Sequence, residues 1–208
     1  MADVDAEDGW IDHTVAREFP ALRLRYAVID AGPTVSPVEL RQRLDDLSTR
    51  FRAHKAMELP TRPIPSAYRV FLRQVGLDPE AHPSPIEAVT RDRILRGNFP
   101  TTHRLADALT VATVESQIAI SVLDAELLDL PLGIRVVRAE DSTELPVGTL
   151  VVADVNGPAA EILGEPEPHC FVGANTTRTA VMALGVDGIA DWMLDDALWR
   201  VAEIAVPK

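Results

Sequence analysis

Three consecutive polar side chains, Thr101, Thr102 and His103, stand between the end of one expected helix and the start of the next. We expect Gly97 to end the first helix, Pro100 to prevent it from resuming, and Thr101 or Thr102 to cap the second. The unpaired N–H groups and the dipole at a helix N-terminus favour a carboxylate, carbonyl or phosphate oxygen. The turn therefore indicates either a binding site for such an oxygen or a simple helix cap.

A second polar stretch, Gly173 to Arg178, lies between two expected strands. Its side chains include Asn175, Thr177 and Arg178, which combine small hydrogen-bonding groups with one guanidinium. This composition is typical of a polar hairpin loop, and it also suits one wall of a ligand pocket.

No familiar catalytic motif is present. The sequence lacks G-x-S-x-G, a P-loop, H-E-x-x-H and G-x-G-x-x-G, the patterns of hydrolase elbows, nucleotide cradles, zinc sites and dinucleotide sites. His169 and Cys170 are expected on a strand, where neighbours point to opposite faces, and no third ligand has a suitable spacing. We expect no metal and no cofactor, so any catalysis would depend on a positioned water and fixed dipoles.

The composition predicts one globular unit of ordinary character. The chain has 208 residues, of which 47% are apolar and 25% charged, enough for a substantial core. We expect residues 1–9 to be a disordered acidic tail and residues 10–208 to form a single domain. A single cysteine excludes an internal disulfide, and no long apolar run or signal-like N-terminus appears. We therefore expect a cytoplasmic protein with no membrane contact.

The charge is unevenly distributed. The net charge is −12, but residues 41–104 carry 12 basic and 7 acidic side chains, a local net of +5. Lys and Arg supply most of the affinity of proteins for nucleic acid. Residues 41–104 therefore predict a possible RNA-facing surface, or else a helix surface whose Arg stems cover apolar area.

The first half of the chain predicts a strand followed by helices. Alternating apolar residues favour a strand over 22–30. Two capping boxes with Pro at the first helical position, Ser36–Glu39 and Ser84–Glu87, predict two helices, the second ending at Gly97. Between them we expect an extended linker over 59–65 and a short helix over 66–75.

The second half predicts strands and a final helix. Strand candidates cover 133–139, 149–154, 169–172 and 179–186, and a helix is expected over 191–205. Strands segregated from helices in this way indicate an α+β fold with a mostly antiparallel sheet in the C-terminal half.

Two blocks of the chain resemble a known family. Residues 91–124 resemble the B3/4 tRNA-binding domain, the editing domain of the bacterial phenylalanyl-tRNA synthetase β subunit, and its free-standing relatives. The residues that carry this resemblance are Phe99, Pro100, His103, Leu105, Ala106, Asp107, Leu123 and Asp124. A second block matches the AYR…F…GLDP pattern of the free-standing proteins through Tyr68, Arg69, Phe71, Gly76, Asp78 and Pro79.

The resemblance implies a B3/4-like domain and an editing activity. The synthetase domain removes tyrosine wrongly attached to phenylalanine tRNA by holding the aminoacyl ester beside an oriented water. Carried onto this sequence, the family implies His103 and Asn175 as catalytic residues. The substrate-binding residues that it implies are Thr101, Thr102, Asp107, Thr110, Ser121, Thr177 and Arg178.

The implied pocket departs from that of the synthetase. Counting from Asp107, the family's Thr-Asn step falls on Leu109 and Thr110, and its pocket histidine falls on Ser121. The pocket is therefore expected to be smaller or more apolar than a tyrosine-selective one.

Three hypotheses follow from the sequence. The first is a free-standing domain that binds the end of an aminoacyl-tRNA, or a related aminoacyl ester, and hydrolyses mischarged species. The second is a non-catalytic tRNA-binding or amino-acid-binding module, and the third is a scaffold whose cavity is filled by side chains. The first expects the turn at Thr101–His103 and the loop at Asn175–Arg178 to face each other across a hollow.

Overall fold

The main sheet is entirely antiparallel. The computed structural model describes residues 4–51 and 58–207, and the strand order of this sheet is β1-β3-β8-β4. Its strands are β1 (Glu7–Asp8), β3 (Arg23–Ile29), β8 (Thr179–Gly185) and β4 (Ala119–Asp124). The central strands β3 and β8 pair along their whole length, and β4 forms one edge.

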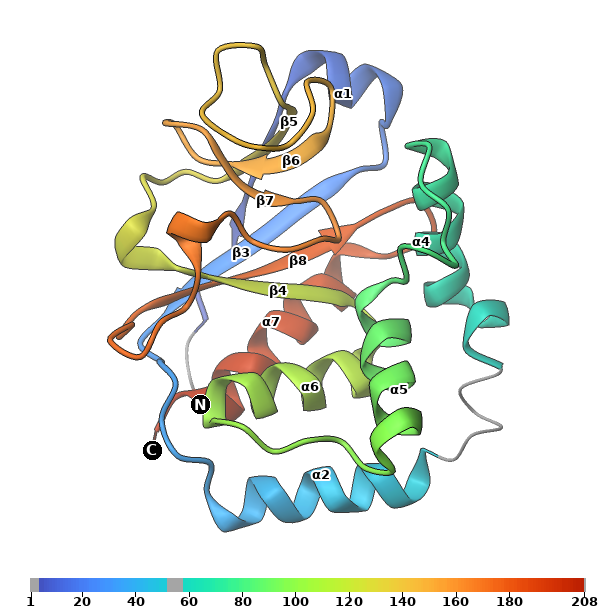
Figure 1. The fold of residues 1–208 in the computed structure, drawn as a ribbon, viewed down its shortest axis with the longest axis vertical. Coiled ribbons are helices and arrows are strands. Elements are labelled where there is room, and N and C mark those ends of the chain that lie inside the picture. Colours follow the sequence, from blue (N-terminus) through green and yellow to red (C-terminus); the bar gives the residue numbers. More distant parts are fainter. Residues whose placement is uncertain (1–3, 52–57, 208) are drawn as a thin grey trace.

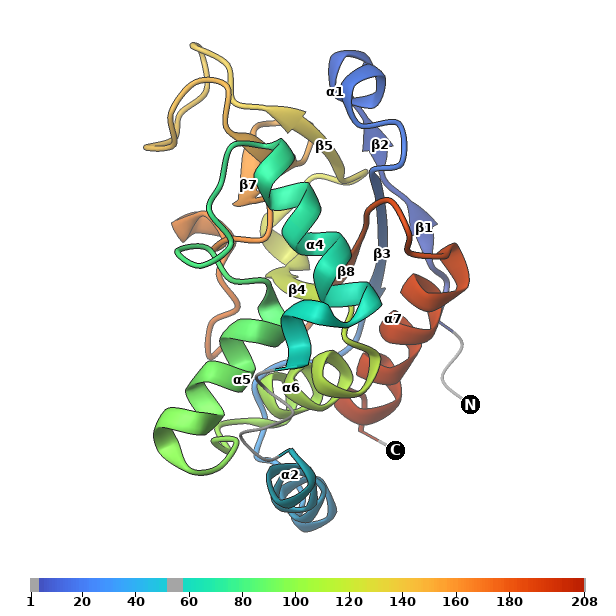
Figure 2. The ribbon, with the colours of Figure 1, turned by 90° about the vertical axis from the view of Figure 1, so that its right-hand side faces the viewer.

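Helix α7 (Asp191–Ala205) covers one face of this sheet (Figure 2). Alternate residues of β3 point to opposite faces, and Arg25 lies on the face toward the helix, with its Nε 2.9 Å from an Asp195 carboxylate oxygen. Leu24 and Tyr26 point the other way and are buried. The helix spans the residues expected from the sequence.

A second, smaller sheet covers the opposite face (Figure 1). Its order is β2-β5-β6-β7, with β2 (Trp10–Ile11) parallel to β5 and the other pairs antiparallel. The remaining strands are β5 (Gly133–Val136), β6 (Leu150–Ala153) and β7 (Pro158–Glu161). Most buried residues of the two sheets belong to one hydrophobic core, while Val151 and Ala153 of β6 pack with Val137 in a separate small cluster.

Further helices complete the fold: α1 (His13–Glu18), α2 (Val38–Arg50), α4 (Pro63–Gln74), α5 (Pro85–Arg96) and α6 (Arg104–Ser116). Helices α5 and α6 pack beside the edge strand β4, α2 packs on α6, and α1 lies beside β5 of the second sheet (Figure 1). Leu40 and Leu44 of α2 pack with Phe99, Val111 and Val114 in a separate small core. This architecture confirms the α+β class.

The capping box predicted for α5 is confirmed. The Ser84 and Glu87 side chains cap each other's backbone, and Gly97 ends the helix in the left-handed conformation with φ of 85°. The equivalent prediction at Ser36 is wrong, because α2 has no side-chain cap. The Ser36 hydroxyl instead donates a hydrogen bond to Asp107.

The expectation of disorder is wrong for Glu7–Asp8, which form β1. Both carboxylates have partners on β3: the Tyr26 hydroxyl donates to Glu7 at 2.9 Å, and Arg25 forms an ion pair with Asp8 at 2.8 Å. Burial, together with the neighbouring Glu7, raises the pKa of Tyr26 to about 12. Residues 1–3 of the expected tail lie outside the described residues.

Two further predictions are corrected. The expected linker over 59–65 contains a 3-10 turn at Leu59–Thr61 and the start of α4 at Pro63, because proline is tolerated in the first turn of a helix. The expected strand over 169–172 is replaced by a 3-10 turn, Pro168–Cys170. The strands β4 and β7 are additions that the sequence did not indicate.

Candidate functional site

A cavity of about 570 Å³ lies where α5 and α6 meet the edge strand β4 and the turn that follows β7. Leu24, Met182 and Leu184 contribute to its apolar lining. The polar and ionisable side chains that line it are His82, Thr110, Thr113, Ser121, Glu161 and Glu165. An apolar cavity with a few polar groups is the usual form of a small-molecule site.

Sheet register places Ser121 at the margin of the apolar lining. Ser121 pairs directly with Met182 across β4 and β8, and Leu24 pairs with Leu184 across β3 and β8. Directly opposite residues share a face of the sheet, so these side chains face the second sheet rather than α7. The edge strand β4 contacts both α5 and α6, and residues of these two helices line the cavity together with Ser121.

Helix α6 contributes two hydroxyl groups to the same cavity. Thr110 and Thr113 lie three residues apart and therefore on one side of the helix. The Thr110 hydroxyl donates to the Ala106 carbonyl at 3.0 Å, which leaves its lone pairs available to accept a hydrogen bond. Thr113 is only 2% exposed, so its position is fixed by packing.

The end of β7 and the turn that follows it bring Glu161 and Glu165 to the cavity lining. The Gly164 N–H donates to the Glu161 carbonyl at 3.1 Å, and Leu163 adopts the left-handed conformation with φ of 56°. This conformation costs a leucine about 1 kcal/mol. A Cβ at position 164 would lie 2.7 Å from Glu161 Oε2, so the carboxylate lies close over the glycine.

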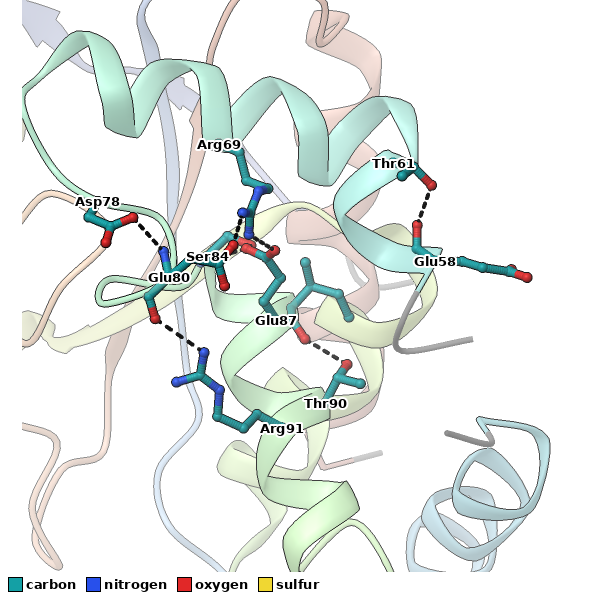
Figure 3. Close-up of polar contacts among 10 residues, drawn as sticks. Glu58, Thr61, Arg69, Asp78, Glu80, Ser84, Glu87, Thr90 and Arg91 are labelled. Atoms are coloured by element: carbon teal, nitrogen blue, oxygen red, sulfur yellow. Dashed lines mark hydrogen bonds and ion pairs between the residues drawn. The ribbon is translucent and has the colours of Figure 1, made fainter. Parts of the chain in front are cut away.

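Arg69 fixes the wall formed by α5 (Figure 3). Its guanidinium reaches from α4 to Glu87 at 2.8 Å and also contacts Glu80. Glu87 in turn accepts from the backbone and hydroxyl of Ser84. The segment before α5, which carries His82 into the cavity lining, is therefore tied to α4.

Tyr68, the neighbour of Arg69, fixes the sheet beneath the cavity. Its hydroxyl donates to the Leu184 carbonyl at 2.7 Å and accepts from the Ala119 N–H at 2.9 Å. Burial raises the pKa of Tyr68 above its ordinary value, so this phenol stays protonated and bridges β8 and β4. Both Tyr68 and Arg69 belong to the pattern that resembles the free-standing family, and both have structural roles here.

The turn at 101–103 is occupied by helix capping. His103, not either threonine, is the N-cap of α6, and its Nδ1 accepts from the Ala106 N–H at 3.2 Å. Asp107 is buried and accepts from the Thr102 N–H at 2.9 Å as well as from Ser36. Thr101 and the Thr102 side chain are exposed. The prediction that a threonine caps this helix is therefore wrong.

The loop at 173–178 also bonds mostly to its own surroundings. The buried Thr176 hydroxyl contacts Asp124 and accepts from the Gly173 N–H at 2.9 Å. The Thr177 hydroxyl donates to Glu126 at 2.8 Å, and Arg178 Nε lies 3.6 Å from Asp30. Asn175 is exposed at the tip.

Residues 30–36 contact both of these regions. The Arg104 N–H donates to the Thr34 carbonyl at 2.7 Å. A Cβ at Gly32 would lie 2.0 Å from the Thr176 carbonyl oxygen, so the two chains touch there. The turn and the loop are thus joined by one chain segment, and neither contributes a residue to the cavity lined by Thr110 and Ser121.

The structure therefore separates the residues that the resemblance groups together. Thr110 and Ser121 line the cavity, whereas His103, Asp107, Asn175 and the other predicted site residues belong to the capping turn and the loop. Sequence reasoning missed His82, Thr113, Glu161 and Glu165 as lining residues. The three-residue spacing from Thr110 was an available signal for Thr113. The other three reach the cavity through tertiary contacts that no local pattern reveals.

Several arginines of segment 41–104 form hydrogen bonds or ion pairs with other residues of the protein. Arg93 donates to the Ser48 carbonyl at 2.7 Å, and Arg104 donates to the Ile204 and Val206 carbonyls. Arg43 pairs with Glu115 at 2.7 Å. Arg91 and Arg96 on α5 remain exposed, although Arg91 donates to the Glu80 carbonyl and Arg96 lies 3.6 Å from Asp92.

The buried Cys170 carries no reactive signature. Burial raises the pKa of its thiol to about 11, and the adjacent His169 is exposed. Across residues 4–51 and 58–207, no group of three or more His, Cys, Asp or Glu side chains is arranged to hold a metal ion.

Within the same ranges, no helix has the length and apolar character that crossing a membrane requires. Comparison with known proteins found neither a family model nor a curated protein that matches this chain.

Proposed function

We propose that the cavity binds the aminoacyl group of an aminoacyl-tRNA, or of a related aminoacyl ester, and that the protein hydrolyses mischarged species in trans. The observation that carries the proposal is the meeting of Thr110 and Ser121 in one cavity. The B3/4 resemblance aligns these two residues with pocket positions of the synthetase domain. They come from different elements, α6 and β4, so their meeting is a property of the fold.

The lining suits an apolar or small amino acid. Leu24, Met182 and Leu184 offer apolar contact, and Thr110 and Ser121 supply hydroxyl groups for hydrogen bonds to the polar atoms of an aminoacyl group. A serine in place of the synthetase's pocket histidine removes an imidazole that tyrosine selection employs. We therefore expect a preference for amino acids other than tyrosine.

Hydrolysis at this site needs no covalent intermediate. Water attacks the carbonyl carbon of the ester, and the single bond between that carbon and the ribose oxygen breaks. The ribose oxygen takes up a proton from the attacking water and leaves as a hydroxyl group. Thr110 and Ser121 hold the acyl group and orient the water, and hydrogen bonds to the developing oxyanion stabilise the transition state.

The exposed arginines of α5 support an RNA-facing role for part of segment 41–104. Arg91 and Arg96 lie on the same helix that contributes Pro85, Ala88 and Val89 to the cavity. Phosphates that follow the aminoacylated end would meet this helix first. Binding of tRNA should then weaken steeply with added salt.

A second candidate is a binding module that does not turn over its ligand. The observation in its favour is that His103 is engaged as a helix cap and that Asn175 lies at an exposed loop tip. Neither residue lines the cavity.

A deacylation panel tests the proposal. Purified protein is incubated with tRNAs carrying each of several incorrect amino acids, and the remaining ester is measured over time. We expect at least one species to be deacylated, and Ser121→Phe, which fills the cavity, to lower that rate by more than about tenfold. Asn175→Ala is the matched control and should retain the rate. No deacylation across the panel would exclude the hydrolytic proposal, and tRNA-end binding without turnover would favour the binding module.

A further inference from the structure

Glu161 is an ionisable residue of the cavity lining that is partly buried and has no hydrogen-bond partner for its carboxylate among the described residues. It lies at the end of β7, and its carboxylate forms no ion pair with those residues either. The other carboxylates of comparable burial are paired: Asp141 with Arg135 at 2.6 Å, and Glu87 with Arg69 at 2.8 Å. Buried carboxylates are usually paired in this way.

The cavity lining contains carboxylates but no Lys or Arg among the described residues. The ionisable side chains of that lining are His82, Glu161 and Glu165. Two carboxylates without a cation attract a positive group and repel a carboxylate or phosphate. The tRNA phosphates must therefore remain outside this cavity.

Glu161 also lines a neighbouring cavity of about 520 Å³ between α1, α4 and the loop before β6. The two cavities share Glu161 and Ile162, so these two residues lie at the boundary between them. A ligand that extends from one cavity toward the other passes Glu161.

We infer that Glu161 binds the free ammonium group of the ligand, so that the site selects amino acids whose amine is free and whose carboxyl group is esterified or amidated. This inference rests on the proposed function and narrows its substrate class. An aminoacyl ester carries one positive charge, which the Glu161 carboxylate complements. A free amino acid carries an additional carboxylate that the lining repels, which favours release of the product. An N-acylated ester has no charge for Glu161 to bind.

Aminoacyl amides test the inference without the complication of turnover. The probes are the amides of L-alanine, L-valine, L-leucine and L-phenylalanine, their N-acetyl derivatives, and the free amino acids. Calorimetry with the full chain should show at least one amide binding, with its N-acetyl derivative and free acid about tenfold weaker or worse. Glu161→Gln should remove this preference. Glu203→Gln is the matched control, because it makes the same charge change at an exposed position of α7 that lines neither of the two cavities.

The pH dependence gives a second readout. An α-amino group loses its proton near pH 8, whereas glutamate and histidine ordinarily titrate near 4.3 and 6.5. The other titratable residues that line the two cavities with Glu161 are Glu165 from its own turn, His82 from the segment before α5, and Glu18 from α1 in the neighbouring cavity. Amide binding should therefore weaken between about pH 7 and pH 9 in the wild-type protein and stay nearly level in Glu161→Gln.

The possible outcomes separate the inference from the proposed function. Equal amide affinity in the wild-type protein and Glu161→Gln would overturn the inference, as would the absence of amide binding, and the deacylation panel would still decide hydrolysis by itself. Amide binding that depends on Glu161, without deacylation of any tRNA, would support the inference and remove hydrolysis.

Discussion

The capping turn at 101–107 and the cavity beside it are both rich in polar groups, but they differ in where those groups bond. In the turn, His103 and Asp107 are occupied by backbone and side-chain partners within the fold. In the cavity, Ser121 and Glu161 have no side-chain partner among residues 4–51 and 58–207. Polar groups that the fold satisfies stabilise it, whereas groups that it leaves unsatisfied at a cavity are free to bind a ligand.

Loss of Arg69 should have the largest effect on stability. Arg69→Met removes the partner of the nearly buried Glu87 and releases the start of α5, so the free energy of unfolding should fall by about 3 kcal/mol. Urea denaturation measures this change. Glu80→Gln, at the exposed end of the same network, should cost much less, and equal losses would show that the burial of Glu87 is unimportant.

Loss of Asp107 should have the second-largest effect on the free energy of unfolding. Asp107→Ala leaves the Thr102 N–H and the Ser36 hydroxyl without their acceptor, which should lower the free energy of unfolding by about 2 kcal/mol. Asp107→Asn keeps one carbonyl oxygen and should recover part of this loss. If Asp107→Ala instead abolished ligand binding while the denaturation midpoint stayed constant, the turn would be a binding site after all.

The cap residue should show a smaller effect. His103→Ala removes the acceptor for the Ala106 N–H, and N-cap losses cost about 1 kcal/mol. His103→Asn supplies another good cap and should restore stability. Because the two variants differ in capping and both lack an imidazole, a deacylation rate lost in both would return His103 to a catalytic role.

Removal of the cavity hydroxyl should have the smallest effect on stability. Ser121→Ala is expected to change the free energy of unfolding by less than about 0.5 kcal/mol, because no described residue depends on that hydroxyl. Affinity for the aminoacyl amide that binds wild-type protein best should nevertheless fall. A large loss of stability with unchanged affinity would reverse the contrast between the two regions.

Local chemistry explains which elements the sequence predicted. Strand β3 alternates buried apolar and partly exposed charged residues from Arg23 to Tyr26, α5 has a capping box and a terminal glycine, and the apolar face of α7 is unbroken. Strand β7, Pro158–Glu161, has no alternating pattern of its own. It is a strand because it pairs with β6, and a sequence pattern does not show that pairing. The sequence contains the same Ser-Pro-x-Glu signal at Ser36 and Ser84, but only tertiary contacts decide that Ser36 bonds to Asp107 instead of capping α2.

The candidate site was harder to predict for the same reason. Counting from Asp107 by the family pattern identified Thr110 and Ser121 as pocket positions. A count along the sequence could find them because Asp107 and Thr110 lie on α6 and Ser121 lies on β4, the next element of the chain. Glu161 lies 40 residues further along the sequence, and its place at the cavity depends on how the second sheet packs over the first. No periodicity within β7 contains that information.

The most direct test is a crystal structure of the protein soaked with a non-hydrolysable aminoacyl-adenosine analogue. We predict that the aminoacyl group lies between Thr110 and Ser121, with its ammonium group at Glu161. An aminoacyl group found instead between His103 and Asn175 would contradict the account.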